Sequence, residues 1–242
     1  MKRRQGSAGV TLLELLVAIT LVSLLFVGIF MAMRIGLNAM DKTNTRMLSN
    51  RRVAGSQRVL ERQIASLMAV VADCQVGSPR ARRRVPFFQG EPESMRFVSA
   101  YSMAEGFRGY PRILEYQVIP GERNEGVRLV VNERMYTGPL SAGMLCLAAR
   151  PEYVPIEVGP QSFVLADRLA YCRFGYLEQR TPDPKDATWR GVWSSPNYPL
   201  AIRVEMAPLE PDPSRLPLLS LTVPLRVNKD PMVAYADTPT VP

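Results

Sequence analysis

The sequence contains no histidine in 242 residues, which removes a large part of enzyme chemistry. Without imidazole there is no Ser-His or Cys-His nucleophile, no histidine general base and no histidine metal ligand. The sequence also lacks a Cys-x-x-Cys pair, a glycine-rich phosphate loop and a Gly-x-Ser-x-Gly nucleophile motif. We therefore expect that the chain is not an enzyme and that it holds no cofactor.

Acidic residues are too sparse to predict a metal site. Asp183 and Asp186 lie close together, but Lys185 between them opposes cation binding. Pro182 and Pro184 surround the same positions, and this pattern predicts a turn. A Ca²⁺ site in this segment is the alternative.

The positive charge is concentrated at the beginning of the chain. The formal net charge is +8, of which residues 1–4 contribute +3 and residues 34–62 contribute +5. Glu14 contributes −1, and the 180 residues after position 62 carry only +1. Residues 34–62 contain no aromatic side chain on which a base could stack, so we expect no nucleic-acid partner. A solvated helix face is favoured there, with lipid headgroups or acidic neighbours as possible contacts.

One long apolar run spans Val10 to Met33, 24 residues with a single ionisable side chain. At 1.5 Å per residue a helix of this length covers roughly 36 Å, enough to cross a hydrocarbon core of about 30 Å. The basic stretch before it is expected to stay in the cytoplasm. A cleavable secretory signal peptide is the alternative, but its apolar region would be shorter, about 7–15 residues.

The single ionisable side chain of this run is Glu14. A charged carboxylate inside a membrane costs on the order of 2–3 kcal/mol or more, so it is expected to have a partner. A Glu close enough to the interface to stay hydrated is the alternative. The segment Gly9-Val10-Thr11-Leu12-Leu13-Glu14-Leu15 and its basic leader resemble the signal of type IV pilins and type II secretion pseudopilins. Val10 departs from the phenylalanine most frequent in that family.

This resemblance implies a processing step and a role for Glu14. Prepilin peptidase would cleave between Gly9 and Val10 and methylate the new N-terminus, leaving 233 residues. Glu14 would then pair with the Val10 amine of a neighbouring subunit, because each buried charge needs the other. Normal assembly of a Glu14→Gln variant would contradict that role.

No proline occurs before Ser78, so one helix is expected from Val10 to about Ala72. Residues 41–52 are almost wholly polar and predict a solvated neck. An apolar stripe follows at helical spacing and predicts a face that packs on a sheet; its residues are Val53, Leu60, Ile64, Leu67 and Val71. Arg80 and Arg82 to Arg84 are expected in an exposed loop, with phosphate binding or an acidic partner as alternatives.

After Pro86 the pattern changes to short β-type runs separated by proline and glycine. Strands are predicted at 95–100, 112–119, 126–133, 144–148, 169–178, 189–193, 200–207 and 218–226. The second and third of these predict a hairpin. The fold class is therefore α+β, with a long N-terminal helix, transmembrane in its first half, packed on an antiparallel sheet as in pilins.

These segments predict five parts of the chain. They are a cleaved leader (1–9), a transmembrane helix (10–33), a polar neck with an amphipathic continuation of the helix (34–75), a β-rich head (76–227) and a loose tail (228–242).

A second, looser resemblance lies in the head. Residues 171–176, Trp189, Trp193 and residues 198–204 are similar to the late region of J-type minor pseudopilins of type II secretion. Pro199-Leu200 inverts the Leu-Pro order usual there. Simple core or hairpin packing is favoured for the two tryptophans over a ligand cage.

Together the resemblances imply a minor pseudopilin at the tip of a periplasmic pseudopilus, anchored once in the bacterial inner membrane. The implied partners are I-type and K-type minor subunits, the major subunit, prepilin peptidase and lipid. Glu14 argues against the K type, which characteristically lacks it. A minor type IV pilin of an adhesion or DNA-uptake pilus is the close alternative, and a membrane-anchored periplasmic enzyme or binding protein is the distant one.

The chain has three cysteines, Cys74, Cys146 and Cys172. In an oxidising periplasm one disulfide and one free thiol are expected. Cys146 and Cys172 lie in predicted strands and are candidates to pair across the sheet. Cys74 could reach either of them, and three buried thiols are a further possibility.

Overall fold

The computed structural model describes residues 11–77, 81–104, 109–147, 150–151, 159, 162–179, 181, 183–210, 220–227 and 232. The chain divides into two compact units, Met1–Asn50 and Arg51–Pro242, and each is described by itself. We call the second unit the head. The predicted residues Gly9, Val10, Arg80 and Ala148, and most of the predicted tail, lie outside the described residues.

Helix α1 spans Leu12–Ala65, and its residues up to Asn50 make up the described part of the first unit. It contains no proline and is rich in leucine, alanine, methionine and arginine, which have high helix propensity. All side chains from Thr11 to Met33 are exposed within this unit. The predicted long helix is therefore confirmed as far as Ala65.

The helix ends earlier than the expected Ala72. Leu67 and Met68 form strand β1 (Leu67–Met68) opposite Ser99 and Val98, and strand β2 (Val71–Gln75) follows. An apolar residue at every third or fourth position fits a helix. The backbone groups of Leu67 and Met68 nevertheless form their hydrogen bonds with strand β5 (Ser94–Ser99) of the sheet. The sequence does not reveal this tertiary choice, and the helical part of the predicted segment 34–75 stops at Ala65.

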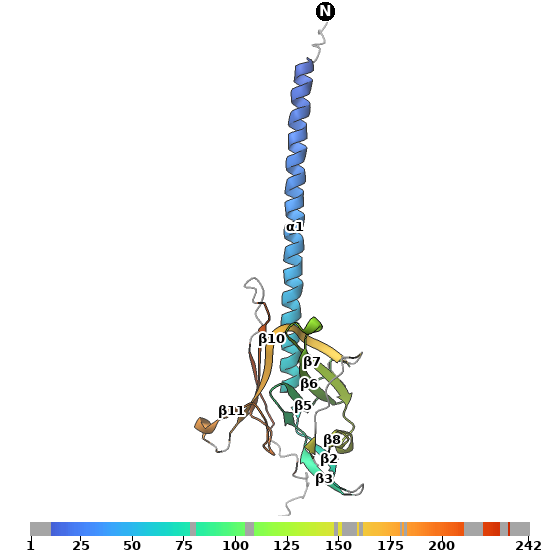
Figure 1. Cartoon of the computed structure of the whole chain (residues 1–242), viewed down its shortest axis with the longest axis vertical. Helices are drawn as coiled ribbons and strands as arrows, with labels where there is room; N and C mark the ends of the chain where they lie inside the picture. Colours follow the sequence, from blue (N-terminus) through green and yellow to red (C-terminus); the bar gives the residue numbers. More distant parts are fainter. Residues whose placement is uncertain are drawn as a thin grey trace, which may run out of the picture. The chain divides into compact units, whose positions relative to one another are not determined.

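Within the described residues the head contains an antiparallel sheet of nine strands. Figure 1 shows β5, β6, β7 and β10 side by side in this sheet. Its main order is β1-β5-β6-β7-β10-β12-β13, with β4 beside β5 and β11 beside β10. The remaining bounds are β4 (Gln89–Gly90), β5 (Ser94–Ser99), β6 (Arg112–Pro120), β7 (Val127–Met135), β10 (Ser162–Glu178), β11 (Thr188–Arg190), β12 (Ala201–Pro208) and β13 (Leu221–Pro224). The predicted α+β class, a long helix with an antiparallel sheet, is confirmed.

The predicted hairpin is formed by β6 and β7, which pair from Arg112↔Met135 to Pro120↔Val127. The 3-10 turn Glu122–Asn124 connects them. Gly126 has φ +64°, and a Cβ there would lie 2.3 Å from the Leu169 carbonyl oxygen of β10. Glycine is therefore required at Gly126, both for the turn and for the close approach of the neighbouring strand.

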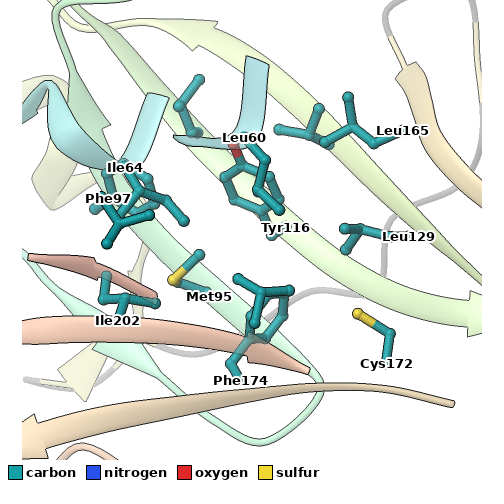
Figure 2. Packing of buried hydrophobic residues seen from close by; sticks show 14 of the residues in the cluster. Leu60, Ile64, Met95, Phe97, Tyr116, Leu129, Leu165, Cys172, Phe174 and Ile202 are labelled. Carbon is teal, nitrogen blue, oxygen red and sulfur yellow. The ribbon is translucent and has the colours of Figure 1, made fainter. Parts of the chain in front are cut away.

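The last turns of α1 pack on one face of this sheet (Figure 2). Leu60 and Ile64 are fully buried among side chains from β5, β6, β7, β10 and β12. The labelled neighbours include Met95, Phe97, Tyr116, Leu129, Phe174 and Ile202. Burial of each large apolar side chain contributes roughly 1.5–3 kcal/mol, so this contact fixes the helix end on the sheet.

A smaller layer covers part of the opposite face of the sheet. It consists of β2, β3 (Arg82–Pro86), α2 (Pro139–Gly143) and the two-residue strands β8 (Cys146–Leu147) and β9 (Arg150–Pro151). Its buried residues form a second cluster with two residues of the main sheet. The members are Ala72, Cys74, Phe87 and Ala142, packed with Val98 and Ile113.

Several predicted boundaries were wrong for identifiable reasons. Arg82 to Arg84 belong to strand β3 and not to a loop. Their backbone pairs with β2, and a run of charged residues gives no apolar alternation from which a strand could be predicted. Strand β10 begins at Ser162, and a bulge with Arg168 at φ +54° interrupts its pattern. The strand predicted at 144–148 begins only at Cys146, since Pro139 starts the short helix α2.

Candidate functional site

Glu14 lies in the first turn of α1, where Thr11 caps the helix. The Glu14 amide donates to the Thr11 carbonyl oxygen at 3.0 Å and approaches Thr11 Oγ1 at 3.4 Å. Thr11-Leu12-Leu13-Glu14 has the spacing of a capping box, in which a carboxylate near the helix N-terminus is favourable. The spacing thus suits the Glu14 carboxylate to a position at the N-terminus of its own helix.

The helix around Glu14 is suited to lipid. It is long and apolar enough to cross a membrane, and the side chains of its apolar segment are exposed. Its hydroxyl groups are satisfied inside the helix: Thr20 Oγ1 donates to the Val17 carbonyl and Ser23 Oγ to the Ile19 carbonyl, both at 2.8 Å. Because lipid offers no hydrogen bonds, such internal satisfaction is what a membrane segment requires.

Comparison with protein families decides the nature of this segment. Residues 4–30 match the family described as the prokaryotic N-terminal methylation motif. The chain carries a type IV pilin-like prepilin signal. The match contains Gly9, Val10 and Glu14, the three positions predicted for processing and assembly. The motif and the apolar helix together indicate membrane anchoring. A comparison with curated proteins found no significant match to the chain.

The neck continues α1 beyond the methylation motif as an exposed helix. Thr43 Oγ1 donates to the Ala39 carbonyl at 2.8 Å and Thr45 Oγ1 to the Asp41 carbonyl at 2.9 Å. These side chains, and the basic residues Arg34, Lys42 and Arg46, are exposed. Within the described residues of the first unit these side chains lie along a single exposed helix, and the solvated helix face stays a prediction.

The disulfide joins Cys74 to Cys146, not Cys146 to Cys172 as the strand pattern suggested. Cys74 lies on β2 and Cys146 follows α2, and these two elements pack on each other. Their Cα atoms are 5.5 Å apart. Cys172 points from β10 into the other core (Figure 2), so the sheet separates it from Cys146.

Cys172 is a free thiol with 1% of its surface exposed. Burial, and secondarily the charge of Glu93, raise the pKa of Cys172 from 9.0 to about 12. Nucleophilic attack requires the thiolate, so the folded thiol is chemically inert. Cys172 therefore serves as a packing residue of the main core.

The Cys172 thiol is expected to resist a maleimide at pH 8 in the folded chain and to react once urea unfolds it. Since each pKa unit changes the thiolate fraction tenfold, the shift alone slows labelling by about 1000-fold. The raised pKa favours the neutral thiol, so its contribution to stability is complete below pH 9 and is lost as the pH rises toward 12. Urea unfolding between pH 9 and pH 12 should show a smaller loss of folding stability with rising pH for Cys172→Ala than for the wild type. Rapid maleimide labelling of the folded chain would contradict the assignment.

The two tryptophans have different environments. Trp193 packs in an aromatic group with Phe88 and Tyr176, and its Nε1 donates to the Asn197 carbonyl at 2.7 Å. Trp189 lies on the outer side of the sheet, where the Arg203 guanidinium carbon is 3.8 Å from its ring centre. The two rings do not form a common cage, and hairpin and core packing account for both.

Tyr198 is a residue whose role the sequence did not indicate. Its hydroxyl donates to the Val70 carbonyl at 2.8 Å and accepts from the Val70 amide at 3.0 Å. Burial raises the pKa of Tyr198 to about 12, despite the opposing hydrogen bond with Val70. The segment that follows α1 is thereby tied to the C-terminal strands across 128 residues.

A buried carboxylate, Glu133 on β7, organises the junction between the helix and the sheet. It accepts hydrogen bonds from Gln63 Nε2 of α1 at 2.8 Å, Ser102 Oγ at 2.6 Å and the Met103 amide at 2.9 Å. The hydroxyl of Tyr116 donates to Gln63 Oε1, and burial followed by the charge of Glu133 raises the pKa of Tyr116 well above its usual value. These donors compensate the buried charge, so Glu133 positions α1 on the sheet.

A second buried charge, Arg96 on β5, lies on the opposite face of the sheet. Arg96 Nε is 3.0 Å from Glu115 Oε1 of β6, with both side chains nearly inaccessible. Arg96 Nη1 donates to Gln89 Oε1 at 2.7 Å. Arg134 approaches Glu115 from the solvent side at 3.5 Å. The positive charge of Arg96 and the negative charge of Glu115 compensate each other, so both can be buried in the protein interior.

The segment around Asp183 and Asp186 is a turn, as predicted. It contains the 3-10 helix Pro184–Asp186, in which the Lys185 amide donates to Asp183 Oδ1 at 3.0 Å. The Thr181 hydroxyl donates to Asp186. In the part of the chain that the structure describes, no group of three or more Cys, Asp or Glu side chains is placed to hold a metal ion.

Proposed function

We propose that the chain is a minor pseudopilin of a type II secretion system, a structural subunit with no catalytic role. The observation that carries this proposal is the methylation motif at residues 4–30, placed at the start of a helix that ends on an antiparallel sheet. This combination of signal, apolar helix and α+β head is the organisation of a pilin-like subunit.

The proposed mechanism is assembly after proteolysis. Prepilin peptidase cleaves between Gly9 and Val10 and methylates Val10, which creates a positive N-terminal amine. The apolar helices then pack with a stagger, so that Glu14 of one subunit pairs with the Val10 amine of its neighbour. In a low dielectric each of these charges is costly alone, so the pair sets the position of entry into the filament.

We further propose that the N-terminus is cytoplasmic and that the head lies in the bacterial periplasm. The Cys74–Cys146 disulfide supports an oxidising location, because such bonds are rare in the cytosol. The basic leader supports the same orientation. Charge alone is a weaker argument here, since residues 34–62 are also basic.

Within the pseudopilin family we propose a J-type subunit at the filament tip. The support is the order of the aromatic strand β10, Trp189 and Trp193, and the Pro199-Leu200-led strand β12. The partners would be I-type and K-type minor subunits and the major subunit, with inner-membrane lipid around the helix. We propose no contact with nucleic acid.

A minor type IV pilin of an adhesion or DNA-uptake pilus is the second candidate, because residues 4–30 serve both systems. A single-pass periplasmic enzyme or binding protein would instead keep an uncut anchor. Deletion of the gene separates the first two. We expect loss of type II secretion with pili retained, restored by the wild-type gene; loss of pili with normal secretion would favour the pilin.

A further inference from the structure

One end of the head carries a small module closed by the disulfide. We define the disulfide module as β2, β3 and residues 139–147, which include α2 and β8. Figure 1 shows β2, β3 and β8 grouped at the end of the head toward which the C-terminus of α1 points. The module shares no residue with the N-terminal helix on which the proposed assembly rests.

The module is held together by a covalent bond and by close contacts. The disulfide joins β2 to the segment after α2, and Ala142 of α2 is fully buried. A Cβ at Gly143 would lie 2.1 Å from the Asp73 carbonyl oxygen, so only glycine allows α2 to approach β2 this closely. The Asp73 carboxylate in turn accepts from Arg84 Nε of β3 at 3.1 Å. One continuous set of contacts therefore joins α2, β2 and β3.

This frame presents apolar side chains to solvent. Leu140 in α2 is 56% exposed, and Met144, one helical turn later, is 86% exposed. Both flank the buried Ala142, which anchors this segment, whereas the side chains of Leu140 and Met144 remain outside. Large apolar side chains that remain exposed on an ordered segment, as Leu140 and Met144 do, indicate a surface that contacts another molecule.

Strand β3, which pairs with β2, adds positive charge on both of its faces. Arg82, Arg83 and Arg84 are all exposed, and Asp73 on the paired strand neutralises only Arg84. Among the described residues no ion pair involves Arg82 or Arg83. The module thus combines exposed leucine and methionine with an excess of arginine, and methionine and arginine are enriched at protein interfaces.

We propose that the disulfide module is a docking surface for a protein partner whose contact face carries Asp and Glu around an apolar recess. Arginine fits carboxylates in a two-pronged geometry, and Leu140 and Met144 would fill the recess. A protein is favoured over an anionic membrane because the disulfide and the close α2–β2 contact preorganise the module, which a fluid lipid surface does not require. The inference goes beyond assembly through the N-terminal helix.

The test uses the full chain in the membranes of cells that produce it. A photo-crosslinking amino acid replaces Met144, and the adduct is mapped by mass spectrometry. The matched control carries the same group at Tyr171, an exposed residue of β10 outside the module. Non-reducing gels verify that the Cys74–Cys146 bond forms in each variant.

We expect the Met144 probe to label a protein segment rich in Asp and Glu, which the Tyr171 probe does not label. Arg82→Glu with Arg83→Glu should lower the yield at least about tenfold, and Arg173→Glu with Arg226→Glu should leave it unchanged. Lysine in place of the partner's acidic residues should restore labelling of the charge-reversed chain. Labelling of lipid, labelling of a segment without acidic residues, equal loss in the control, or no adduct above the Tyr171 level would overturn the proposal. If the mature N-terminus proved unprocessed while Met144 labelled as expected, the pseudopilin assignment would fail and this surface would stand.

Discussion

Replacing Cys74 and Cys146 together with alanine is expected to lower the free energy of unfolding of the head by about 4 kcal/mol. The bond closes a loop with a sequence separation of 72 residues. In the chain-entropy description, a cross-link over a loop of this length removes much of the freedom of the unfolded chain. This loss is a large fraction of the total free energy of unfolding of a native domain, which is typically about 5–15 kcal/mol.

The effect should be visible in urea unfolding of the full chain followed by tryptophan fluorescence. Trp193 lies in the aromatic group with Phe88 and Tyr176, so its emission reports on the head core. A reductant should move the wild-type midpoint to that of the double variant and should leave the double variant unchanged. An unaltered midpoint in the double variant, or a further shift of that variant on reduction, would contradict the predicted contribution.

Glu14→Gln is expected to leave cleavage after Gly9 intact and to reduce incorporation into the filament by at least about 100-fold. Removing one partner of a buried ion pair costs about 3–5 kcal/mol, since the other charge remains without compensation. Each 1.4 kcal/mol corresponds to about a factor of ten. The measurement compares the subunit in sheared filaments with the processed subunit in the membrane.

This substitution also separates two roles of Glu14. Glutamine keeps the Thr-x-x-Glu/Gln spacing and the backbone hydrogen bond to Thr11 Oγ1, so a role confined to the helix end predicts little change. Asp41→Asn is the matched control, because it removes a carboxylate from the same helix beyond the motif. Normal incorporation of Glu14→Gln, or an equal defect in Asp41→Asn, would exclude the proposed pairing with the neighbour's amine.

The sequence was most informative where one local pattern determines the structure. The apolar run and Glu14 indicated the membrane segment and its signal, and the methylation motif confirms the signal. Two apolar β-type runs, 112–119 and 126–133, separated by turn residues, located the central hairpin. Leu60 and Ile64 were correctly placed on the face that packs on the sheet.

The sequence was least informative where distant segments decide the outcome. The end of α1 depends on β5, which pairs with Leu67 and Met68, and on Tyr198, which bonds Val70. The cysteine pairing depends on how closely α2 approaches β2, a contact that Gly143 permits. Such contacts join residues far apart in the chain, so no local spacing predicts them.

Mass spectrometry of the mature N-terminus tests the central claim most directly. The account predicts a chain that begins at Val10 with a methylated α-amino group and lacks the nine-residue leader. An intact Met1, or a new N-terminus after Met33, would contradict it.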